Sequence, residues 1–302
     1  MKKYSLLGKL AILTATLFWG TSFVVLKDTL DLVPPNYLIA LRFTSAGLIL
    51  GLIFWKRLRK VTRQMLWRGA IIGVFLFLAY FWQTLGLQRT TPGKNAFLTA
   101  GYCVMVPFML WGVRGPRPDR YNVIAAVLCL GGIGLISLEG DLSMGFGDLF
   151  TVIGGVFFGC HMVALGKFLR DEDPVAMTIL QFAAAAVCFW AASLVMEGAP
   201  QAVPVQALLP IGYMSLFCTA ATLLLQNFGQ KYTEPSAAAI LLSLEAVFGA
   251  MFSLMLGKER LSFQVAAGFV TIFLSVIVSE TKLSFLGKTE SVGIMNKRSD
   301  GK

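Results

Sequence analysis

Long apolar runs separated by short polar stretches dominate the sequence. Each run is close to the length of about 20 residues with which an α-helix crosses roughly 30 Å of hydrocarbon. Prolines, glycines and charged residues stand between the runs, as at Pro34-Pro35 and from Arg114 to Pro118. The pattern predicts an all-α integral membrane protein of ten transmembrane helices, near residues 10–27, 36–55, 67–88, 93–112, 121–138, 147–167, 174–196, 207–229, 234–256 and 262–280.

The composition agrees with a chain that is surrounded by lipid. Of the 302 residues, 56% are hydrophobic and 14% are charged, whereas a soluble domain has about 25% charged residues. The five cysteines lie in five different predicted helices and have neither metal-ligand spacing nor loop positions that suit a disulfide. We therefore expect no metal site and no cofactor. We interpret the five cysteines as small core or lipid-facing residues: Cys103, Cys129, Cys160, Cys188 and Cys218.

The basic residues predict how the chain is oriented. With a cytoplasmic N-terminus, 20 of the 26 Lys and Arg residues fall on the cytoplasmic side and five on the other, while Arg42 lies within a helix. This bias follows the positive-inside rule, and it places both termini in the cytoplasm. We expect a multi-pass protein of the bacterial inner membrane, the plasma membrane. The net charge of +10 arises from these loops, so it does not indicate nucleic-acid binding.

The two halves of the chain are weakly similar. An offset of 139 residues places Pro35 on Pro174, and an offset of 143 places Gln83 on Gln226. The alternative is chance similarity between helices rich in leucine and alanine. Five helices per half is an odd number, so the second half would enter the membrane from the opposite side. Inverted repeats of this kind support alternating access in secondary transporters.

These observations divide the chain into four parts. Two inverted five-helix repeats would occupy residues 10–138 and 139–280. A cytoplasmic N-terminal segment, 1–9, would precede them, because the first apolar run lacks a convincing signal-peptide cleavage site and is expected to stay as a helix. A polar cytoplasmic tail, 281–302, would follow and is expected to be disordered.

Four stretches of the sequence stand out: Leu17-Phe-Trp-Gly-Thr-Ser-Phe-Val-Val-Leu-Lys27, Leu41-Arg-Phe43 after Pro34-Pro35, the run from Pro235 to Ala250, and Gly257-Lys-Glu-Arg-Leu261. Together they resemble the EamA-like branch of the drug/metabolite transporter superfamily. The resemblance covers residues 10–280. It implies ten helices in two inverted repeats around a central cavity, with the fifth and tenth helices peripheral, and transport, often export, of amino acids or other metabolites.

The sequence departs from this family at one position. The family usually has proline after the glutamate in the middle of the ninth helix, and here Ala246 follows Glu245. The corresponding break in the fourth helix is expected at Pro107, which is therefore a candidate for a helix break or gate.

Three ionisable residues within the predicted spans are candidates for substrate binding. A carboxyl group at mid-membrane, as at Glu245, favours its neutral form unless it is paired or hydrated, so it could exchange a proton during transport or anchor a substrate cation. It could equally tie two helices together. Arg42 could pair with a substrate carboxylate, although a structural role is favoured. His161, the only histidine, is interpreted as a hydrogen-bonded packing residue, with substrate contact as the alternative.

Aromatic and amide side chains complete the candidates. Trp19, Tyr80 and Tyr102 fall at comparable depths, where aromatic rings would suit a cavity that accepts apolar or aromatic groups. Gln83 and Gln226 occupy matching repeat positions, which we expect near opposite membrane faces. There they could cap helix breaks as gates close, or they could form ordinary hydrogen bonds between helices.

The function that fits best is a secondary transporter, an exporter of small metabolites such as amino acids, working by alternating access. Its partners would be a small-molecule substrate, the lipid bilayer and protons as a candidate coupling ion; the oligomeric state stays open. The alternative is an exchanger of phosphorylated sugars or nucleotide-sugars. Such substrates need several basic side chains, and the spans offer Arg42, with Lys27 and Lys94 at helix ends. An enzyme is not expected, because no nucleophile–base set or paired carboxylates converge.

Overall fold

The computed structural model describes residues 2–115, 117–137, 144–169, 172–199, 202–232, 235–258 and 260–282. The predicted tail lies almost entirely outside these ranges, and so does Glu259 of the family motif. Within them, the regular secondary structure is helical. In chain order the elements are α1 (Lys2–Thr29), α2 (Pro35–Ile53), α3 (Trp55–Leu58), α4 (Arg63–Arg89), α5 (Pro92–Ala100), α6 (Tyr102–Gly112), α7 (Arg120–Ser137), α8 (Phe146–Phe168), α9 (Pro174–Met196), α10 (Val205–Ser215), η1 (Leu216–Ala221), α11 (Thr222–Tyr232), α12 (Pro235–Met255) and α13 (Phe263–Thr281).

Seven stretches of the described chain are long and apolar enough to cross a membrane. They are Leu6–Thr29, Pro35–Ile53, Arg63–Arg89, Pro92–Gly112, Phe146–Phe168, Pro174–Met196 and Val205–Gln230. Three shorter apolar helices, Arg120–Ile136, Leu241–Met255 and Phe263–Ser279, fall at the remaining apolar runs of the sequence. The chain is therefore an all-helical, multi-pass membrane protein.

The helix ends follow from local sequence. Pro35, Pro92 and Pro174 each occupy the first turn of a helix, where the missing N–H leaves no hydrogen bond unmade. Side-chain caps start other helices: the hydroxyl group of Thr62 accepts a hydrogen bond from the Met65 N–H at 3.2 Å, and that of Ser262 accepts one from Val265 at 3.2 Å.

The fourth apolar run is broken, but not where we expect it from the sequence. The break between α5 and α6 lies at Gly101, whereas Pro107 lies inside α6. Proline lacks the N–H that would bond to the carbonyl group four residues earlier, and its ring crowds that carbonyl. The disturbance therefore falls on the turn that precedes Pro107. At Gly101 the carbonyl group accepts a tighter, three-residue hydrogen bond from Val104, at 3.2 Å.

The eighth apolar run contains a second irregularity that the hydrophobic pattern does not predict. Between α10 and α11 the chain forms η1, a π-helical turn of six residues. The hydroxyl group of Thr219 donates a hydrogen bond to the Met214 carbonyl group, five residues earlier, at 2.9 Å. Single π-helical turns inside α-helices occur frequently at functional sites.

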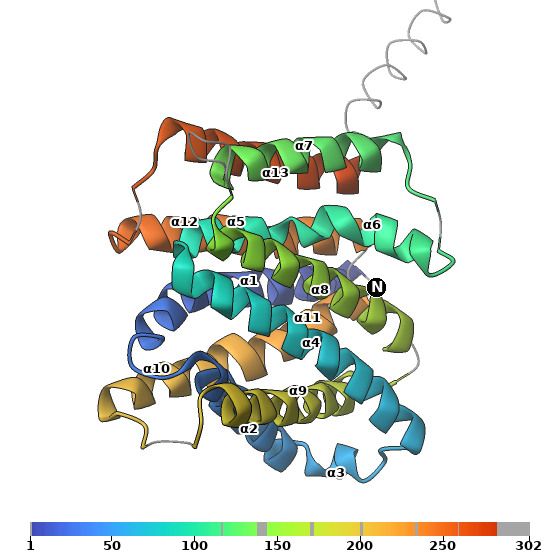
Figure 1. The fold of residues 1–302 in the computed structure, drawn as a ribbon. Helices are drawn as coiled ribbons and strands as arrows, with labels where there is room; N and C mark the ends of the chain where they lie inside the picture. Colours follow the sequence, from blue (N-terminus) through green and yellow to red (C-terminus); the bar gives the residue numbers. More distant parts are fainter. Residues whose placement is uncertain are drawn as a thin grey trace, which may run out of the picture.

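The helices pack side by side into a bundle (Figure 1). Helix α1 packs against α11 and α12, α4 packs against α8 and α9, and α2 packs against α9. Helices α7 and α13 pair with each other at one edge of the bundle, as Figure 1 shows. That position agrees with the peripheral fifth and tenth helices which the family resemblance implies.

The bundle exposes large apolar side chains and buries several polar and charged ones among its apolar core clusters. Val195, Leu209 and Phe263 are each more than 80% exposed, whereas Arg42 is 1% exposed and Asn95 is fully buried. A soluble protein rarely exposes apolar patches on this scale. This distribution is favourable in lipid, because the exposed apolar side chains contact the hydrocarbon core of the bilayer. Polar groups are unfavourable there, so they lie inside the bundle, where they can form hydrogen bonds.

Candidate functional site

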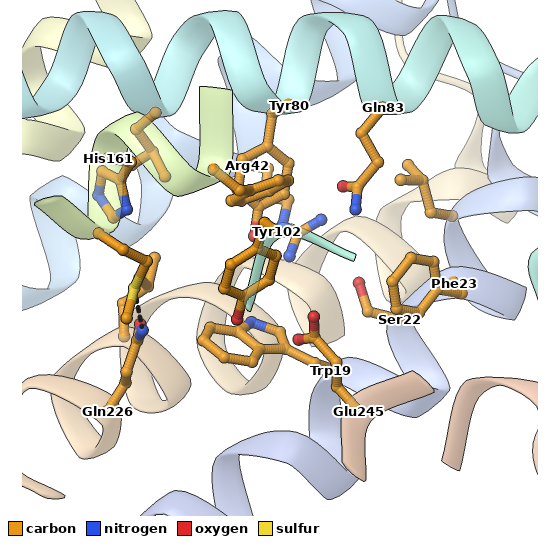
Figure 2. A pocket seen from close by; sticks show the side chains of 15 residues that line it. Trp19, Ser22, Phe23, Arg42, Tyr80, Gln83, Tyr102, His161, Gln226 and Glu245 are labelled. Atoms are coloured by element: carbon orange, nitrogen blue, oxygen red, sulfur yellow. Dashed lines mark hydrogen bonds between the residues drawn. The ribbon is translucent and has the colours of Figure 1, made fainter. Parts of the chain in front are cut away.

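A cavity lies at the centre of the bundle, between α1, α2, α4, α6, α8, α11 and α12 (Figure 2). About 50 Å³ of it is open to the centres of water molecules. One water needs roughly 10–15 Å³ on this measure, so the cavity holds a few waters in the present conformation. Its walls bring together eight residues singled out from the sequence: Trp19, Arg42, Tyr80, Gln83, Tyr102, His161, Gln226 and Glu245. Pro107 is not among the lining residues.

Arg42 reaches the cavity from the second turn of α2 and is almost completely buried. Its Nε donates a hydrogen bond to the hydroxyl group of Thr219, and its Nη2 donates one to the Cys218 carbonyl group at 2.9 Å. The guanidinium carbon lies 5.3 Å from the centre of the Tyr80 ring. The third nitrogen, Nη1, is buried and has no hydrogen-bond partner in the described part of the chain. Within the described residues, Nη1 is thus the one guanidinium nitrogen whose N–H groups are unpaired.

Glu245 supplies the opposite charge from the middle of α12. Its side chain is 7% exposed, and Figure 2 shows the carboxyl group directed into the cavity beside Trp19. Across the described residues, it makes no hydrogen bond, and the ion pairs of the structure do not include it. A buried charge without a partner is unfavourable by several kcal/mol, roughly 3–5 when a partner is removed. The cavity therefore favours a cation or a proton at this carboxyl group.

His161 and Gln181 form a polar pair at the wall formed by α8. His161 Nε2 and Gln181 Oε1 lie 2.8 Å apart in a hydrogen bond, and both side chains are buried. The 139-residue offset that matches the two halves places Ser22 on His161 and Arg42 on Gln181. His161 is therefore both hydrogen-bonded to Gln181 and part of the cavity wall.

The two matched glutamines both lie in the wall of this cavity, on opposite sides of it in Figure 2, and their expected positions near opposite membrane faces stay a prediction. Gln83 Nε2 donates a hydrogen bond to the Thr99 hydroxyl group at 3.1 Å, which ties α4 to α5. Gln226 Nε2 donates to the sulfur atom of Met162 at 3.4 Å, which ties α11 to α8. The Gln226 Oε1 atom is buried without a partner among the described residues, so it is a free acceptor at the cavity.

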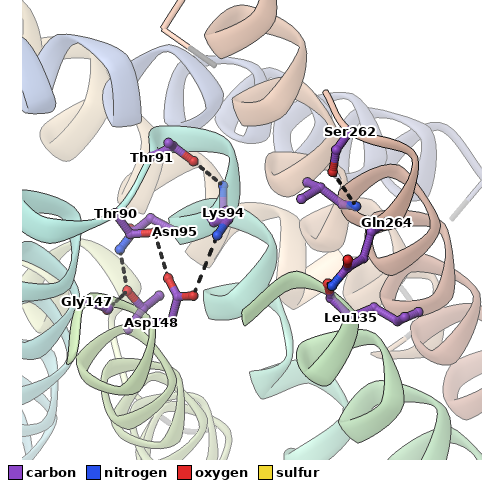
Figure 3. Close-up of polar contacts among 11 residues, drawn as sticks. Thr90, Thr91, Lys94, Asn95, Leu135, Gly147, Asp148, Ser262 and Gln264 are labelled. Atoms are coloured by element: carbon purple, nitrogen blue, oxygen red, sulfur yellow. Dashed lines mark hydrogen bonds and ion pairs between the residues drawn. The ribbon is translucent and has the colours of Figure 1, made fainter. Parts of the chain in front are cut away.

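Polar contacts around the α4–α5 turn join helices at one end of the bundle (Figure 3). Lys27 Nζ donates hydrogen bonds to carbonyl groups at the end of α4, those of Leu87 at 2.6 Å, Gln88 at 3.0 Å and Thr90 at 3.1 Å. The Thr90 hydroxyl group donates to Asp148 of α8 at 2.6 Å. A cation at a helix C-terminus is favourable because the last carbonyl groups carry partial negative charge. Helices α1, α4 and α8 are thereby joined at this end.

Ion pairs join the helices at the opposite end. Arg68 of α4 pairs with Glu172 at 2.7 Å, and Arg57 of α3 pairs with Asp173, the residue that caps α9. Burial opposes ionisation of Asp173, but the Ala176 N–H and the Arg57 guanidinium outweigh it and hold the pKa of the Asp173 carboxyl group below its usual value. The α3–α4 segment is thus fixed to the start of α9.

Sequence reasoning missed Cys218 and Thr219, although they hold Arg42. Both lie in η1, and their residue types alone suggest ordinary packing in an apolar helix. The Cys218 carbonyl group also accepts a hydrogen bond from Trp19 Nε1 at 3.1 Å. A carbonyl group that accepts hydrogen bonds from two side chains requires a local departure from the α-helical hydrogen-bond pattern. The side-chain pattern of the eighth apolar run does not predict this departure.

Comparisons with known proteins agree with this fold. The EamA-like transporter family matches the chain twice, over residues 6–138 and 145–281. An uncharacterized transporter of Archaeoglobus fulgidus is 30% identical over 276 residues, which cover 90% of this chain and 85% of that protein. The uncharacterized inner membrane transporter YedA of Escherichia coli K12 is 21% identical, with 92% of each chain covered.

A protein of known crystal structure has the same fold. It superposes with a TM-score of 0.69, covering 92% of this chain and 98% of its own, at 17% sequence identity. The two family matches together take in most of the chain, and the relatives are matched over nearly their full length. The chain therefore belongs to the EamA-like transporter family.

Proposed function

We propose that this protein is a secondary transporter that exports small zwitterionic metabolites, such as amino acids, by alternating access. The observation that carries the proposal is the pairing of unmet groups in one central cavity. Among the described residues, Arg42 Nη1 is buried without a hydrogen-bond partner, and the buried carboxyl group of Glu245 takes part in none of the ion pairs. Both face the same space between aromatic walls.

A zwitterion would satisfy both groups at once. Its carboxylate would accept a hydrogen bond from Arg42 Nη1, and its ammonium group would lie against Glu245. Charge-assisted hydrogen bonds of this kind are about twice as strong as neutral ones. Trp19, Phe158 and Tyr102 would surround an apolar side chain of the substrate. In the absence of substrate, water would accept the hydrogen bond of Arg42 Nη1, and a proton or water would take the place of the ammonium group at Glu245.

The phosphorylated alternative fits the same cavity poorly. Phosphate carries up to two negative charges and is usually held by several basic side chains. Among the residues that line the cavity in the described chain, Arg42 is the one with a permanent positive charge. One unpaired nitrogen of a single guanidinium suits a carboxylate better than a phosphate dianion.

Two inverted repeats, 10–138 and 139–280, support alternating access in this proposal. The family matches the chain twice over segments of similar length. Exchanging the halves pairs α1 with α8, α4 with α10–α11, and α5–α6 with α12. Under this exchange the packing of α1 on α11 and α12 corresponds to the packing of α8 on α4 and on α5–α6. Related halves of this kind can rock between two states of similar energy.

In the proposed orientation both termini are cytoplasmic, in a bacterial inner membrane. The loops with most basic residues, including the stretch from Lys56 to Arg63, then face the cytoplasm. The contacts around Lys27 and Asp148 close the outer end, and the ion pairs of Arg57 and Arg68 close part of the inner end. Export is the direction that the family resemblance implies. Protons are the proposed coupling ion, acting at Glu245.

The proposal is tested by transport in proteoliposomes that contain the purified protein. The probes are the twenty radiolabelled L-amino acids, each measured by counterflow, with glucose 6-phosphate and UDP-glucose as the comparison. We expect saturable counterflow of one or more amino acids with apolar side chains, and an increase when a pH gradient is imposed. Counterflow of the phosphorylated compounds without any of an amino acid would contradict the assignment.

A further inference from the structure

The π-helical turn η1 holds the charged group of the cavity in an unusual way. Two successive residues of this turn, Cys218 and Thr219, are buried and offer a carbonyl group and a hydroxyl group. Both bond to the guanidinium of Arg42. Arg42 comes from α2, so these two bonds connect α2 to the eighth apolar run across the cavity.

The hydroxyl group of Thr219 is fully used in this arrangement. It accepts a hydrogen bond from Arg42 Nε and donates one to the Met214 carbonyl group at 2.9 Å. Its direction is therefore fixed from both sides. The side chain is completely buried, so water cannot replace either bond without opening the helix packing.

The Cys218 carbonyl group fixes the second nitrogen and adds Trp19 to the same arrangement. It accepts from Arg42 Nη2 at 2.9 Å and from Trp19 Nε1 at 3.1 Å. With Nε and Nη2 held, the plane of the guanidinium has no rotational freedom left. Nη1 is then the one nitrogen that stays without a partner in the described chain.

We propose that Thr219 is a positioning residue that orients the Arg42 guanidinium so that Nη1 alone is presented to the substrate, which makes the site selective for a single carboxylate. The inference rests on the proposed function and goes further by naming the residue that sets the anion preference. A guanidinium released from Thr219 could turn and present two nitrogens, or could withdraw towards Tyr80. Either change would weaken the contact between Nη1 and the substrate carboxylate.

Valine in place of Thr219 keeps the shape of the side chain and removes its hydroxyl group. Thr219→Val is expected to raise the KM for L-leucine about tenfold, in line with the loss of one charge-assisted hydrogen bond. Any change in the maximum rate should be equal for L-leucine and L-leucinamide, because a bond between the two halves affects the conformational cycle in the same way for every substrate. The KM for L-leucinamide, which lacks the carboxylate, should not change. Thr219→Ser restores the hydroxyl group and should restore the KM.

The matched control is Thr222→Val. Thr222 lies three residues further on, is also buried, and its hydroxyl group donates a hydrogen bond to the Thr219 carbonyl group at 3.4 Å, with no bond to Arg42. It should leave both KM values unchanged. Thermal unfolding in detergent adds a readout that needs no substrate. The fall in Tm caused by Thr219→Val should disappear when Arg42 is already methionine, because contacting residues are not additive.

The outcomes separate the two levels of the argument. Equal KM changes for L-leucine and L-leucinamide, no KM change with Thr219→Val, or an additive Tm cycle would each overturn the positioning role. In those cases, transport of L-leucine by the unaltered protein leaves the proposed function standing. If the unaltered protein moves no amino acid at all, the proposed function fails, and the carboxylate preference set by Thr219 fails with it, whatever the Tm cycle shows.

Discussion

Replacing Arg42 with methionine is expected to lower the kcat/KM for amino-acid counterflow about 100-fold. Loss of a buried, hydrogen-bonded charge partner typically weakens binding by about 2–5 kcal/mol, and 2.7 kcal/mol corresponds to 100-fold. Methionine has a similar length and no charge, so the cavity would lose its cation without gaining a large void. Initial rates of counterflow in proteoliposomes, at equal amounts of reconstituted protein, measure the effect.

Protein yield and Tm should change little in the Arg42→Met variant. An apolar residue of similar volume often replaces a buried charge without destabilising a protein, provided that no charged partner is left behind. Leu48→Met is the control, since Leu48 lies on the same helix, α2, and is 61% exposed towards lipid. Arg42→Lys should be nearly as inactive, because a single ammonium group cannot hold Cys218 and Thr219 and also face the cavity. Full activity with lysine or methionine would remove Arg42 from the site.

Replacing Glu245 with glutamine is expected to abolish the response of transport to a pH gradient. Glutamine has the same shape but neither charge nor a proton that can be exchanged. It also provides a weaker partner for an ammonium group, so the KM for the substrate should rise at least tenfold, or about 1.4 kcal/mol. Counterflow at equal pH on both sides separates the binding effect from the coupling effect.

The control for Glu245 is its neighbour on α12. Leu244→Val changes the volume of a half-buried side chain and leaves the carboxyl group in place. It should preserve both the KM and the response to pH. If Glu245→Gln and Leu244→Val gave equal fluxes at equal expression, Glu245 would serve in packing alone, and protons would have no acceptor at this position.

Much of the helix pattern could be predicted from the sequence, because apolar length is a strong signal in membrane proteins. Prolines at helix starts, as at Pro35 and Pro174, fixed the boundaries closely. The residues that line the cavity were also accessible to reasoning from sequence. A charged or polar residue within an apolar run is unfavourable in lipid, so Arg42, Glu245 and His161 had to lie inside the bundle. The interior of the bundle is small, so these side chains line the same cavity.

The departures from regular helix were not accessible in this way. Pro107 indicates a disturbed helix, yet the break lies at Gly101. Proline disrupts the turn that precedes it, and glycine has the greatest backbone freedom to leave the helical conformation. The π-helical turn at Leu216–Ala221 has no proline or glycine of its own. Its Cys218 carbonyl group accepts hydrogen bonds from Arg42 and Trp19, which are about 180–200 residues away in the sequence. Such distant partners cannot be predicted from the residues of the turn itself.

Several polar groups of the cavity have no partner within the described chain because they come from different helices. Arg42, Glu245 and Gln226 belong to three different helices, and packing against Thr219, Met162 and their neighbours holds each in place. If the halves rock, these groups would be exposed to one side of the membrane and then to the other. Their unmet hydrogen-bonding capacity would then be available to substrate on both sides.

The most direct measurement is the accessibility of a cysteine placed in the cavity wall. Ser22→Cys, with the partly exposed Cys160 and Cys188 replaced by alanine, would be treated with a membrane-impermeant thiol reagent in right-side-out and in inside-out vesicles. Lys60→Cys, in the exposed loop after α3, is the reference for the proposed orientation. We expect Ser22→Cys to react from both sides and to be protected by L-leucine, and Lys60→Cys to react in inside-out vesicles alone. Reaction of Ser22→Cys from one side under all conditions would contradict alternating access, and reaction of Lys60→Cys in right-side-out vesicles would contradict the orientation.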